Sequence, residues 1–165
     1  MPAPPRVHVA PVEAGTREAV IGLRVQPPQQ DFVGPAATAL ADAEHCPGSE
    51  PMAILRDGVP IGFYRIERNA AVIAGRDLGP GAFGLRSFFI DAAWQGRGLG
   101  TLALEAALAD LCRRHAGARL LALTVNCRNH AALALYRGGG FEDSGELYHG
   151  GRSGPQHLLL RRLPG

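Results

Sequence analysis

The chain has 165 residues, with 17 basic side chains that are all arginine and 15 acidic ones. Because lysine is absent, the chain cannot form a lysine Schiff base, use a lysine as a catalytic base, or build a phosphate loop of the GxxxxGK[ST] type. A net charge of +2 is too small to indicate nucleic-acid binding. The contents of 46% hydrophobic and 19% charged residues are typical of a single folded domain of this length.

The sequence predicts a cytoplasmic protein with no membrane partner. It contains no apolar run approaching the roughly 20 residues needed to span a bilayer, and its first residues lack the apolar core of a secretory signal. Its 3 cysteines are far apart and favour free thiols rather than disulfides or a metal site. We expect a flexible, proline-rich tail at residues 1–6 and one domain over residues 7–165.

Strands and helices are expected in mixed order along the chain. The predicted strands cover residues 7–12, 52–56, 59–67, 83–91, 119–125, 141–148 and 157–163. The predicted helices cover residues 16–23, 36–44, 99–115 and 129–137, with Thr16 and Asn129 as N-caps. Asp57-Gly58 predicts a tight turn, because both central residues of such a turn need positive φ. This order predicts an α/β fold with a mixed sheet and helices on its faces.

Glycines open the long helix expected at residue 99. Gly96, Gly98 and Gly100 lie within five positions, where the backbone N–H groups of a helix start have no intrahelical partner. Together with the helix dipole, these groups favour a bound anion, and Arg97 can add a charge-assisted hydrogen bond. A dinucleotide fingerprint GxGxxG counted from Gly96 would need glycine in place of Thr101, so this motif is not matched.

Two motifs together resemble the GNAT acyltransferase superfamily. Gln95, Gly98 and Gly100 fill the Q/R-x-x-G-x-G/A pattern of its acyl-CoA pyrophosphate loop. One helix and one strand later, residues 129–141 are similar to its N-x-x-A-x-x-L-Y-x-x-x-G-F pattern, through Asn129, Ala132, Leu135, Tyr136, Gly140 and Phe141. The resemblance covers residues 52–163 and implies the GNAT acyl-CoA N-acyltransferase fold, with a splayed central sheet flanked by helices.

The resemblance also implies roles for individual residues. Acetyl-CoA would lie between the splayed strands, with its pantetheine arm on the main chain of the first strand and its pyrophosphate on the amides of the glycine loop. Tyr136 takes the position of the general acid that protonates the departing thiolate. The expected cofactor-binding residues are Phe89, Ile90, Gln95, Gly96, Arg97, Gly98, Leu99, Gly100, Thr101, Asn129 and Tyr136.

The general base is not assigned by the resemblance. Some family members carry a glutamate midway along the strand before the loop, and residues 83–90 contain no carboxylate. The nearest candidates are Asp91 and Glu67, and a water held by the backbone is the alternative. We therefore expect Tyr136 and Asp91 as catalytic residues in a direct attack of an amine on acetyl-CoA within a ternary complex.

Charge distribution favours a cationic primary amine as acceptor. Residues 1–85 carry 7 arginines and 9 acids, and residues 86–165 carry 10 arginines and 6 acids. The basic half contains the loop expected to bind polyanionic CoA, and the acidic half contains the segments that shape the acceptor side in the family. A short similarity to polyamine and diamine acetyltransferases near residues 30–43 points the same way. Candidate substrate carboxylates are Asp31, Asp42, Glu44 and Glu67.

Several alternatives remain open at this point. The missing strand glutamate supports a non-catalytic acyl-CoA-binding or sensing module, and peptide or protein N-termini and aminoglycosides are further acceptors to consider. Arg113, Arg114 and Arg119 do not establish a nucleic-acid binder, because cations are favoured at a helix C-terminus in any case. Family members often form homodimers through C-terminal strands, so the leucines at 158–160 belong either to such an edge or to the core.

Overall fold

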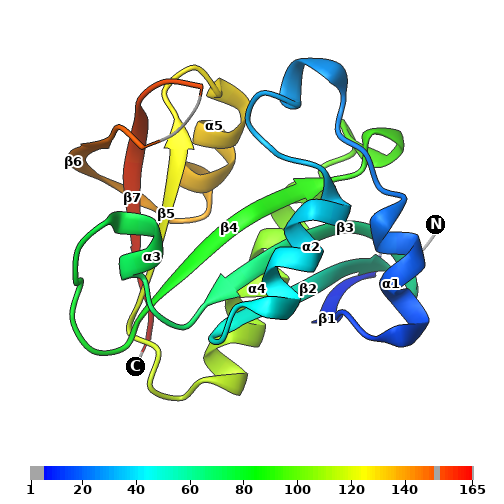
Figure 1. Ribbon diagram of the computed structural model, residues 1–165, viewed down its shortest axis with the longest axis horizontal. Coiled ribbons are helices and arrows are strands. Elements are labelled where there is room, and N and C mark those ends of the chain that lie inside the picture. Colours follow the sequence, from blue (N-terminus) through cyan, green and yellow to red (C-terminus); the bar gives the residue numbers. More distant parts are fainter. Residues whose placement is uncertain (1–5, 151–152, 165) are drawn as a thin grey trace.

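The computed structural model describes residues 6–150 and 153–164. Over these residues the chain forms a seven-stranded mixed sheet with helices on both faces (Figure 1). The strands are β1 (Val7–Pro11), β2 (Ser49–Arg56), β3 (Val59–Glu67), β4 (Ala82–Ile90), β5 (Leu120–Asn126), β6 (Glu142–Tyr148) and β7 (Gln156–Arg162). The helices are α1 (Ala14–Ile21), α2 (Ala36–His45), α3 (Ala71–Ala74), α4 (Leu99–Arg114) and α5 (His130–Gly138), with 3-10 turns η1 (Pro27–Gln29) and η2 (Ala92–Trp94).

The predicted α/β mixed sheet is confirmed, and the element bounds differ from the prediction by a few residues. The Asp57-Gly58 turn has positive φ at both residues, 49° and 84°, as expected. Helix α1 begins earlier than predicted, because Thr16 lies inside the helix and its hydroxyl accepts a hydrogen bond from the Glu13 N–H at 3.2 Å. The predicted tail at residues 1–6 lies outside the described residues except for Arg6, whose carbonyl accepts a hydrogen bond from the Asp57 N–H.

The two central strands part after a short paired section. The parallel strands β4 and β5 pair only at Ala82 with Leu120, Phe83 with Leu121, and Gly84 with Ala122. Beyond these pairs β4 is joined only to β3, and β5 only to β7. Figure 1 shows β4 and β5 diverging from their common lower end. The result is a wedge whose walls carry backbone groups outside the sheet ladder.

A β-bulge causes β4 to turn away from β5. The register with β3 shifts between Phe63 and Arg65, and Ser87 on β4 has a φ of 57°, a conformation uncommon for a residue with a side chain. Leu85 and Phe89 are four residues apart and would share one face of a regular strand. Instead, Leu85 packs in the core beneath α4, and Phe89 packs in the core beneath α1 and α2. The bulge therefore exchanges the two faces of β4 and increases its local twist.

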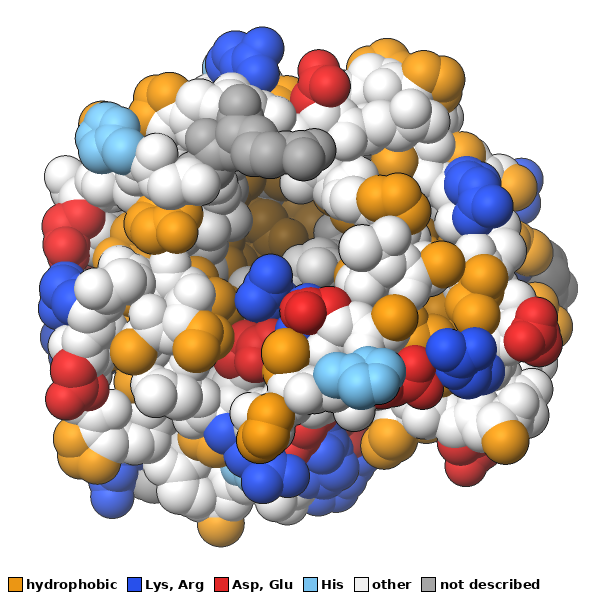
Figure 2. Space-filling model, in the orientation of Figure 1, with side chains coloured by type: hydrophobic (Ala, Val, Ile, Leu, Met, Phe, Trp, Pro, Cys, Tyr) orange, Lys and Arg blue, Asp and Glu red, His pale blue; other side chains and the backbone are white. Residues whose placement is uncertain are grey.

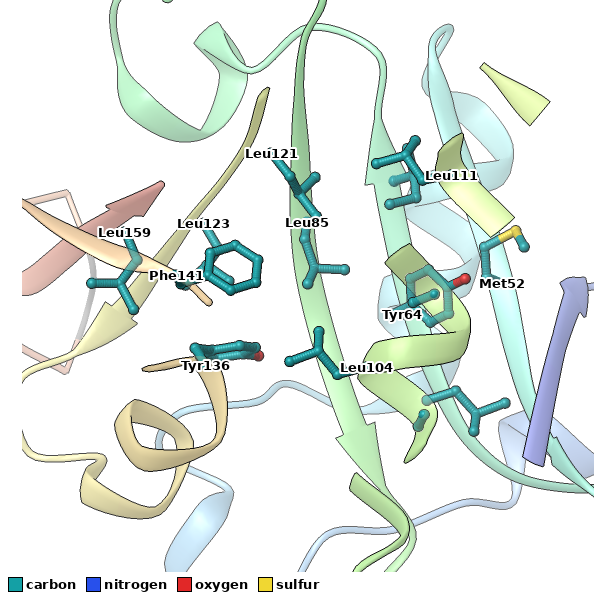
Figure 3. Close-up of a cluster of buried hydrophobic side chains, with 14 of the residues drawn as sticks. Met52, Tyr64, Leu85, Leu104, Leu111, Leu121, Leu123, Tyr136, Phe141 and Leu159 are labelled. Atoms are coloured by element: carbon teal, nitrogen blue, oxygen red, sulfur yellow. The ribbon is translucent and has the colours of Figure 1, made fainter. Parts of the chain in front are cut away.

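The larger core lies between the sheet and α4. Leu104 and Leu111 of α4 pack with Tyr64, Leu85 and Leu121 of the strands, and all five side chains are at most 2% exposed (Figure 3). Burial of each large apolar side chain contributes about 1.5–3 kcal/mol to folding. Leu99 at the start of α4 and Ile90 at the end of β4 belong to the same core, which places these two ends side by side.

The position of β7 answers the question about the C-terminal leucines. The strand order is β1-β2-β3-β4-β5-β7-β6, so β7 lies inside the sheet and β6 forms its edge in the described chain. Leu158 and Leu159 are buried at 3% and 0% exposure. These leucines therefore belong to the core.

None of the helices within residues 6–150 and 153–164 has the length and apolar character needed to cross a membrane.

A charge cluster fastens the end of α4 to β2. The Glu50 carboxylate, 13% exposed, accepts hydrogen bonds of 3.0 Å from Arg68 and Arg114, and lies 3.0 Å from the His115 ring nitrogen. Burial opposes ionisation of this carboxyl, but the three hydrogen bonds outweigh burial and lower the pKa of Glu50 from its ordinary value.

Substituting Glu50→Gln tests this cluster. Since the folded-state pKa lies below that of the unfolded chain, the carboxylate stabilises the fold above about pH 4.3, and this contribution is lost as the pH falls through the folded-state pKa. We expect E50Q to lower the free energy of unfolding by about 1–3 kcal/mol at neutral pH. In urea denaturation, the difference from wild type should shrink as the pH falls below about 4.

The matched control is Glu146→Gln. The Glu146 side chain pairs with Arg76, but the two side chains are 46% and 50% exposed, and exposed pairs contribute little. This control should leave the free energy of unfolding nearly unchanged. A constant difference between E50Q and wild type from pH 7 to pH 3 would contradict the assigned role of the Glu50 charge.

Candidate functional site

Two adjoining pockets, each of about 370 Å³, occupy the wedge between β4 and β5. The first, which we call the loop pocket, is lined by the end of β4, the glycine loop and the start of α5. The second, which we call the sheet pocket, is lined by residues 30–34, residues 85–88 of β4 and residues 123–126 of β5. Figure 2 shows a hollow with an apolar floor in this face of the molecule. The two pockets share Val33, Phe88, Asn129, Ala132 and Tyr136.

Most residues expected to bind a cofactor meet in the loop pocket. Those that line it are Phe89, Ile90, Gln95, Gly96, Gly98, Leu99, Gly100, Asn129 and Tyr136. Arg97 and Thr101 are not part of this lining. The guanidinium of Arg97 stacks on the Trp94 ring at 5.2 Å, and Thr101 is an exposed residue in the first turn of α4.

Glycine is required at two positions of the loop. Gly96 and Gly98 have φ angles of 77° and 74°, in the left-handed region that L side chains rarely adopt, and Gly98 is the N-cap of α4. The Gln95 amide donates hydrogen bonds to the Ile90 carbonyl at 2.7 Å and to the Gln29 side-chain oxygen at 2.8 Å. The loop is therefore fixed to β4 and to η1, with the unpaired N–H groups of the first turn of α4 available for an anion.

Asn129 and Tyr136 are positioned by α5. The Asn129 side-chain oxygen accepts the Ala132 N–H at 3.3 Å and caps the helix, as predicted, which leaves its NH₂ group available to the pocket. The Tyr136 ring packs edge-on against Phe88 and Phe141, with centroids 6.2 and 5.6 Å away.

The Tyr136 hydroxyl is directed toward β4 (Figure 3) and has no hydrogen-bond partner among the described residues. Burial raises the pKa of Tyr136, whose side chain lies at the junction of the two pockets. The phenol therefore stays protonated at neutral pH and has its proton available for donation.

Asp91 and Glu67, the two candidate bases, lie outside the lining of both pockets. The Asp91 carboxylate accepts hydrogen bonds from the Arg24 N–H at 2.7 Å and the Ala93 N–H at 3.3 Å, and so holds the start of the loop against the α1–η1 segment. The Glu67 carboxylate accepts a hydrogen bond from the Ser49 hydroxyl at 2.9 Å and lies 3.2 Å from the Arg65 guanidinium. Both carboxylates are thus occupied by protein groups.

The candidate substrate carboxylates are divided among three places. Asp31 lines the sheet pocket. Asp42 and Glu67 form ion pairs with buried Arg65 at 2.9 and 3.2 Å. Glu44 pairs with Arg17 on the surface at 3.0 Å. Only Asp31 is therefore placed to meet a molecule inside the pocket.

Sequence reasoning missed several polar residues of the sheet pocket. They are Arg86, Ser87, Thr124 and Asn126. Asn126 is 7% exposed and holds the surrounding loop, because its amide donates to the Ser153 carbonyl and its oxygen accepts the Arg128 N–H. No motif marks these positions, since the bulge and the splay decide which side chains reach the wedge.

Comparison with known proteins identifies the family. Residues 19–141 match the model of the acetyltransferase (GNAT) family. The chain is 28% identical to the spermine/spermidine N(1)-acetyltransferase of Bacillus subtilis over 86% of this chain and 91% of that protein. It is 31% identical to an aminoglycoside N(6')-acetyltransferase of Stenotrophomonas maltophilia over 76% of this chain and 78% of that protein.

The fold agrees with this relationship. The structure of AAC(6')-Ib in complex with paromomycin and acetyl-CoA superimposes with a TM-score of 0.71 and 18% identity, over 94% of this chain and 93% of that chain. The chain therefore belongs to the GNAT acetyltransferase family, and the predicted GNAT fold is confirmed. It is a GNAT-family N-acetyltransferase.

Substituting Gly98→Ala tests the loop geometry. A Cβ at this position meets no atom within 4 Å, so any effect comes from the left-handed backbone alone. We expect a loss of about 1–2 kcal/mol in the free energy of unfolding and weaker binding of CoA, because an L residue disfavours this conformation. Thermal unfolding and calorimetric titration with CoA measure the two effects.

Gly15→Ala is the control, since Gly15 lies in α1 with ordinary φ and open space around it. This substitution should raise stability by up to about 1 kcal/mol through helix propensity and leave CoA affinity unchanged. Equal effects of the two substitutions on CoA affinity would contradict a special role for the loop.

Proposed function

We propose that the protein transfers the acetyl group of acetyl-CoA to the primary amine of a small acceptor, by direct attack within a ternary complex. In this proposal the loop pocket holds the donor and the sheet pocket holds the acceptor. The observation that carries the proposal is that the two pockets meet at Tyr136, Phe88 and Asn129. Two reactants in these pockets would have their reacting ends side by side, which is the main requirement for direct transfer.

The residues of the loop pocket suit the chemistry of acetyl-CoA. The unpaired N–H groups at the start of α4 match the charge of a pyrophosphate. The edge of β4 at Phe89 and Ile90 is not paired with β5 and would offer backbone groups to the amides of a pantetheine arm, although the Ile90 carbonyl already accepts the Gln95 amide, and Asn129 offers a side-chain NH₂ group. Phe88, Leu99 and Leu135 supply apolar surface for the methylene groups between these amides.

Tyr136 is proposed as the general acid. Formation of the new C–N bond is followed by cleavage of the C–S bond, and the Tyr136 hydroxyl would donate its proton to the departing sulfur. Its raised pKa keeps this hydroxyl protonated through the neutral and mildly alkaline range. Because the hydroxyl makes no hydrogen bond within residues 6–150 and 153–164, it is available for this donation.

The proposed acceptor carries at least one ammonium group. Asp31 contributes a carboxylate to the sheet pocket, and Ser87, Thr124 and Asn126 are neutral polar residues of the same lining. The names of two relatives describe enzymes that act on spermine and spermidine, and on aminoglycosides, which supports a small amine as acceptor. A panel of diamines, polyamines, amino acids, aminoglycosides and peptides should be incubated with acetyl-CoA, with thiol release and acetylated products measured.

This panel also separates an enzyme from a non-catalytic acyl-CoA-binding module. The module would bind CoA in calorimetry without releasing thiol with any amine. Acetylation of peptide N-termini alone would instead favour the N-terminal acetyltransferase alternative.

We further propose that the enzyme acts in the cytoplasm, where the free thiols of Cys46, Cys112 and Cys127 would remain reduced.

If two copies form a homodimer by strand pairing, the available edge on this side of the sheet is β6, because β7 is internal. Sedimentation velocity of the whole chain measures the oligomeric state.

Substituting Tyr136→Phe tests the general acid. The aromatic contacts with Phe88 and Phe141 remain, so we expect the same thermal stability and the same affinity for CoA. The value of kcat should fall at least tenfold, since a positioned acid contributes about 10²–10⁴ in rate. An unchanged kcat in the thiol-release assay would remove Tyr136 from the mechanism.

The amine is proposed to lose its proton to a water in the sheet pocket, because neither Asp91 nor Glu67 lines a pocket. Asp91 then acts as a positioning residue for the glycine loop. We expect Asp91→Asn to raise the KM for acetyl-CoA while the pH profile of kcat keeps the wild-type shape. Loss of the acidic limb of that profile in D91N would instead identify Asp91 as the general base.

A further inference from the structure

The sheet pocket contains an arginine that the proposed transfer does not use. Arg86 lies on β4 immediately before the bulge, and its side chain is 44% exposed and lines the pocket. One guanidinium nitrogen lies 3.8 Å from a Glu67 oxygen, which is too long for a hydrogen bond. Within the described part of the chain, Arg86 donates no hydrogen bond. Its N–H groups are therefore available to a molecule in the pocket.

The neighbouring carboxylates take their short contacts from Arg65 rather than from Arg86. Arg65, directly opposite Arg86 in the register of β3 and β4, is 2% exposed. It pairs with Asp42 at 2.9 Å and with Glu67 at 3.2 Å, and donates hydrogen bonds to the Ser49 hydroxyl at 3.0 and 3.1 Å. The same Glu67 oxygen also accepts the Ser49 hydroxyl. Arg65 thus makes the short contacts of this network, and Arg86 contributes to it only through the longer ion pair with Glu67, which leaves its N–H groups free of hydrogen bonds there.

The pocket carries one charge of each sign. Among the described residues that line it, Arg86 is the one cation and Asp31 is the one carboxylate. A purely cationic acceptor would be attracted by Asp31 and repelled by Arg86. A molecule with both an ammonium and an anionic group would satisfy both side chains.

We propose that the acceptor carries a carboxylate besides its amine, and that Arg86 binds this carboxylate and determines specificity for it. The planar guanidinium presents paired N–H donors that match the two oxygens of a carboxylate. The acceptor amine faces Tyr136 at the pocket junction, and a second ammonium group, where present, faces Asp31. The substrate class is thus a small amino acid, including diamino acids. This inference rests on the proposed function, because it specifies the acceptor of the same transfer.

The test compares acceptor pairs that differ only in the carboxylate. Ornithine is paired with putrescine, lysine with cadaverine, and phenylalanine with phenethylamine. For at least one pair, the wild-type protein should show a kcat/KM at least tenfold higher for the amino acid. Arg86→Gln should remove this preference by raising the KM of the amino acid at least tenfold, since hydrogen bonds to charged groups are the strong ones. The KM for acetyl-CoA should stay within threefold of wild type. The kcat/KM for the amine without carboxylate should not fall, and for a diamine it should rise, because R86Q removes a like charge from the pocket.

Two further variants make the result specific to the guanidinium. Arg86→Lys keeps the charge without the paired donors and should restore only part of the preference. Arg76→Gln is the matched control, because Arg76 pairs with Glu146 at an exposed site and does not line the pocket. It should keep the wild-type preference.

The outcomes distinguish this inference from the function on which it rests. If no amine in any pair releases thiol, the proposed function fails and the inference fails with it. If amines are acetylated but the wild-type protein favours the partner without a carboxylate in every pair, only the inference is overturned. The same conclusion follows if R86Q lowers kcat/KM equally for both members of a pair.

Discussion

The parting of β4 from β5 is the constraint on which the site depends. Parallel strands normally continue their ladder of hydrogen bonds, and here the ladder stops after three residue pairs. The bulge at Ser87 directs the rest of β4 away, and β3 and β7 pair with the outer edges of the two strands. Separation is tolerated because each strand stays paired with its outer neighbour. The inner edges are left with unsatisfied backbone groups, which a ligand with amide groups can complete as an added strand would.

The charged and polar groups around the wedge differ in whether they have partners within the protein. Buried charges are paired within the protein, as Arg65 is with Asp42 and Glu67, which avoids the cost of an isolated charge in a low-dielectric interior. The groups that face the pockets have few protein partners. They include the Tyr136 hydroxyl and the Arg86 guanidinium. This contrast between satisfied and unsatisfied groups separates the residues that hold the fold from those that can act on a ligand.

The sequence allowed the order of elements and the location of the glycine loop to be predicted, because both depend on local signals. The Asp57-Gly58 turn and the Asn129 cap are short-range features with clear steric or hydrogen-bonding causes. Helix α3 was missed, because four residues give no helical period. The composition of the sheet pocket was also missed. Residues 83–90 are mostly apolar, so the pattern contains no sign of the bulge that sends Arg86 and Phe88 to different faces.

Because of the bulge, the site depends on the number of residues in β4 as well as on their identities. Ser87 is the extra residue of the bulge. The alternation of side-chain faces that includes Leu85 ends before it, and a second alternation runs from Phe88 to Ile90. Deleting this one small residue would leave a single residue opposite Tyr64 and would keep Leu85, Phe88 and Phe89 on their present faces, because the pairs on both sides of the bulge already match β3. The bulge and the twist that it adds would be lost, so the rest of β4 would no longer be directed away from β5. Substitutions along β4 can therefore alter what the enzyme accepts, whereas the loss of one residue from its length would remove the cause of the wedge itself.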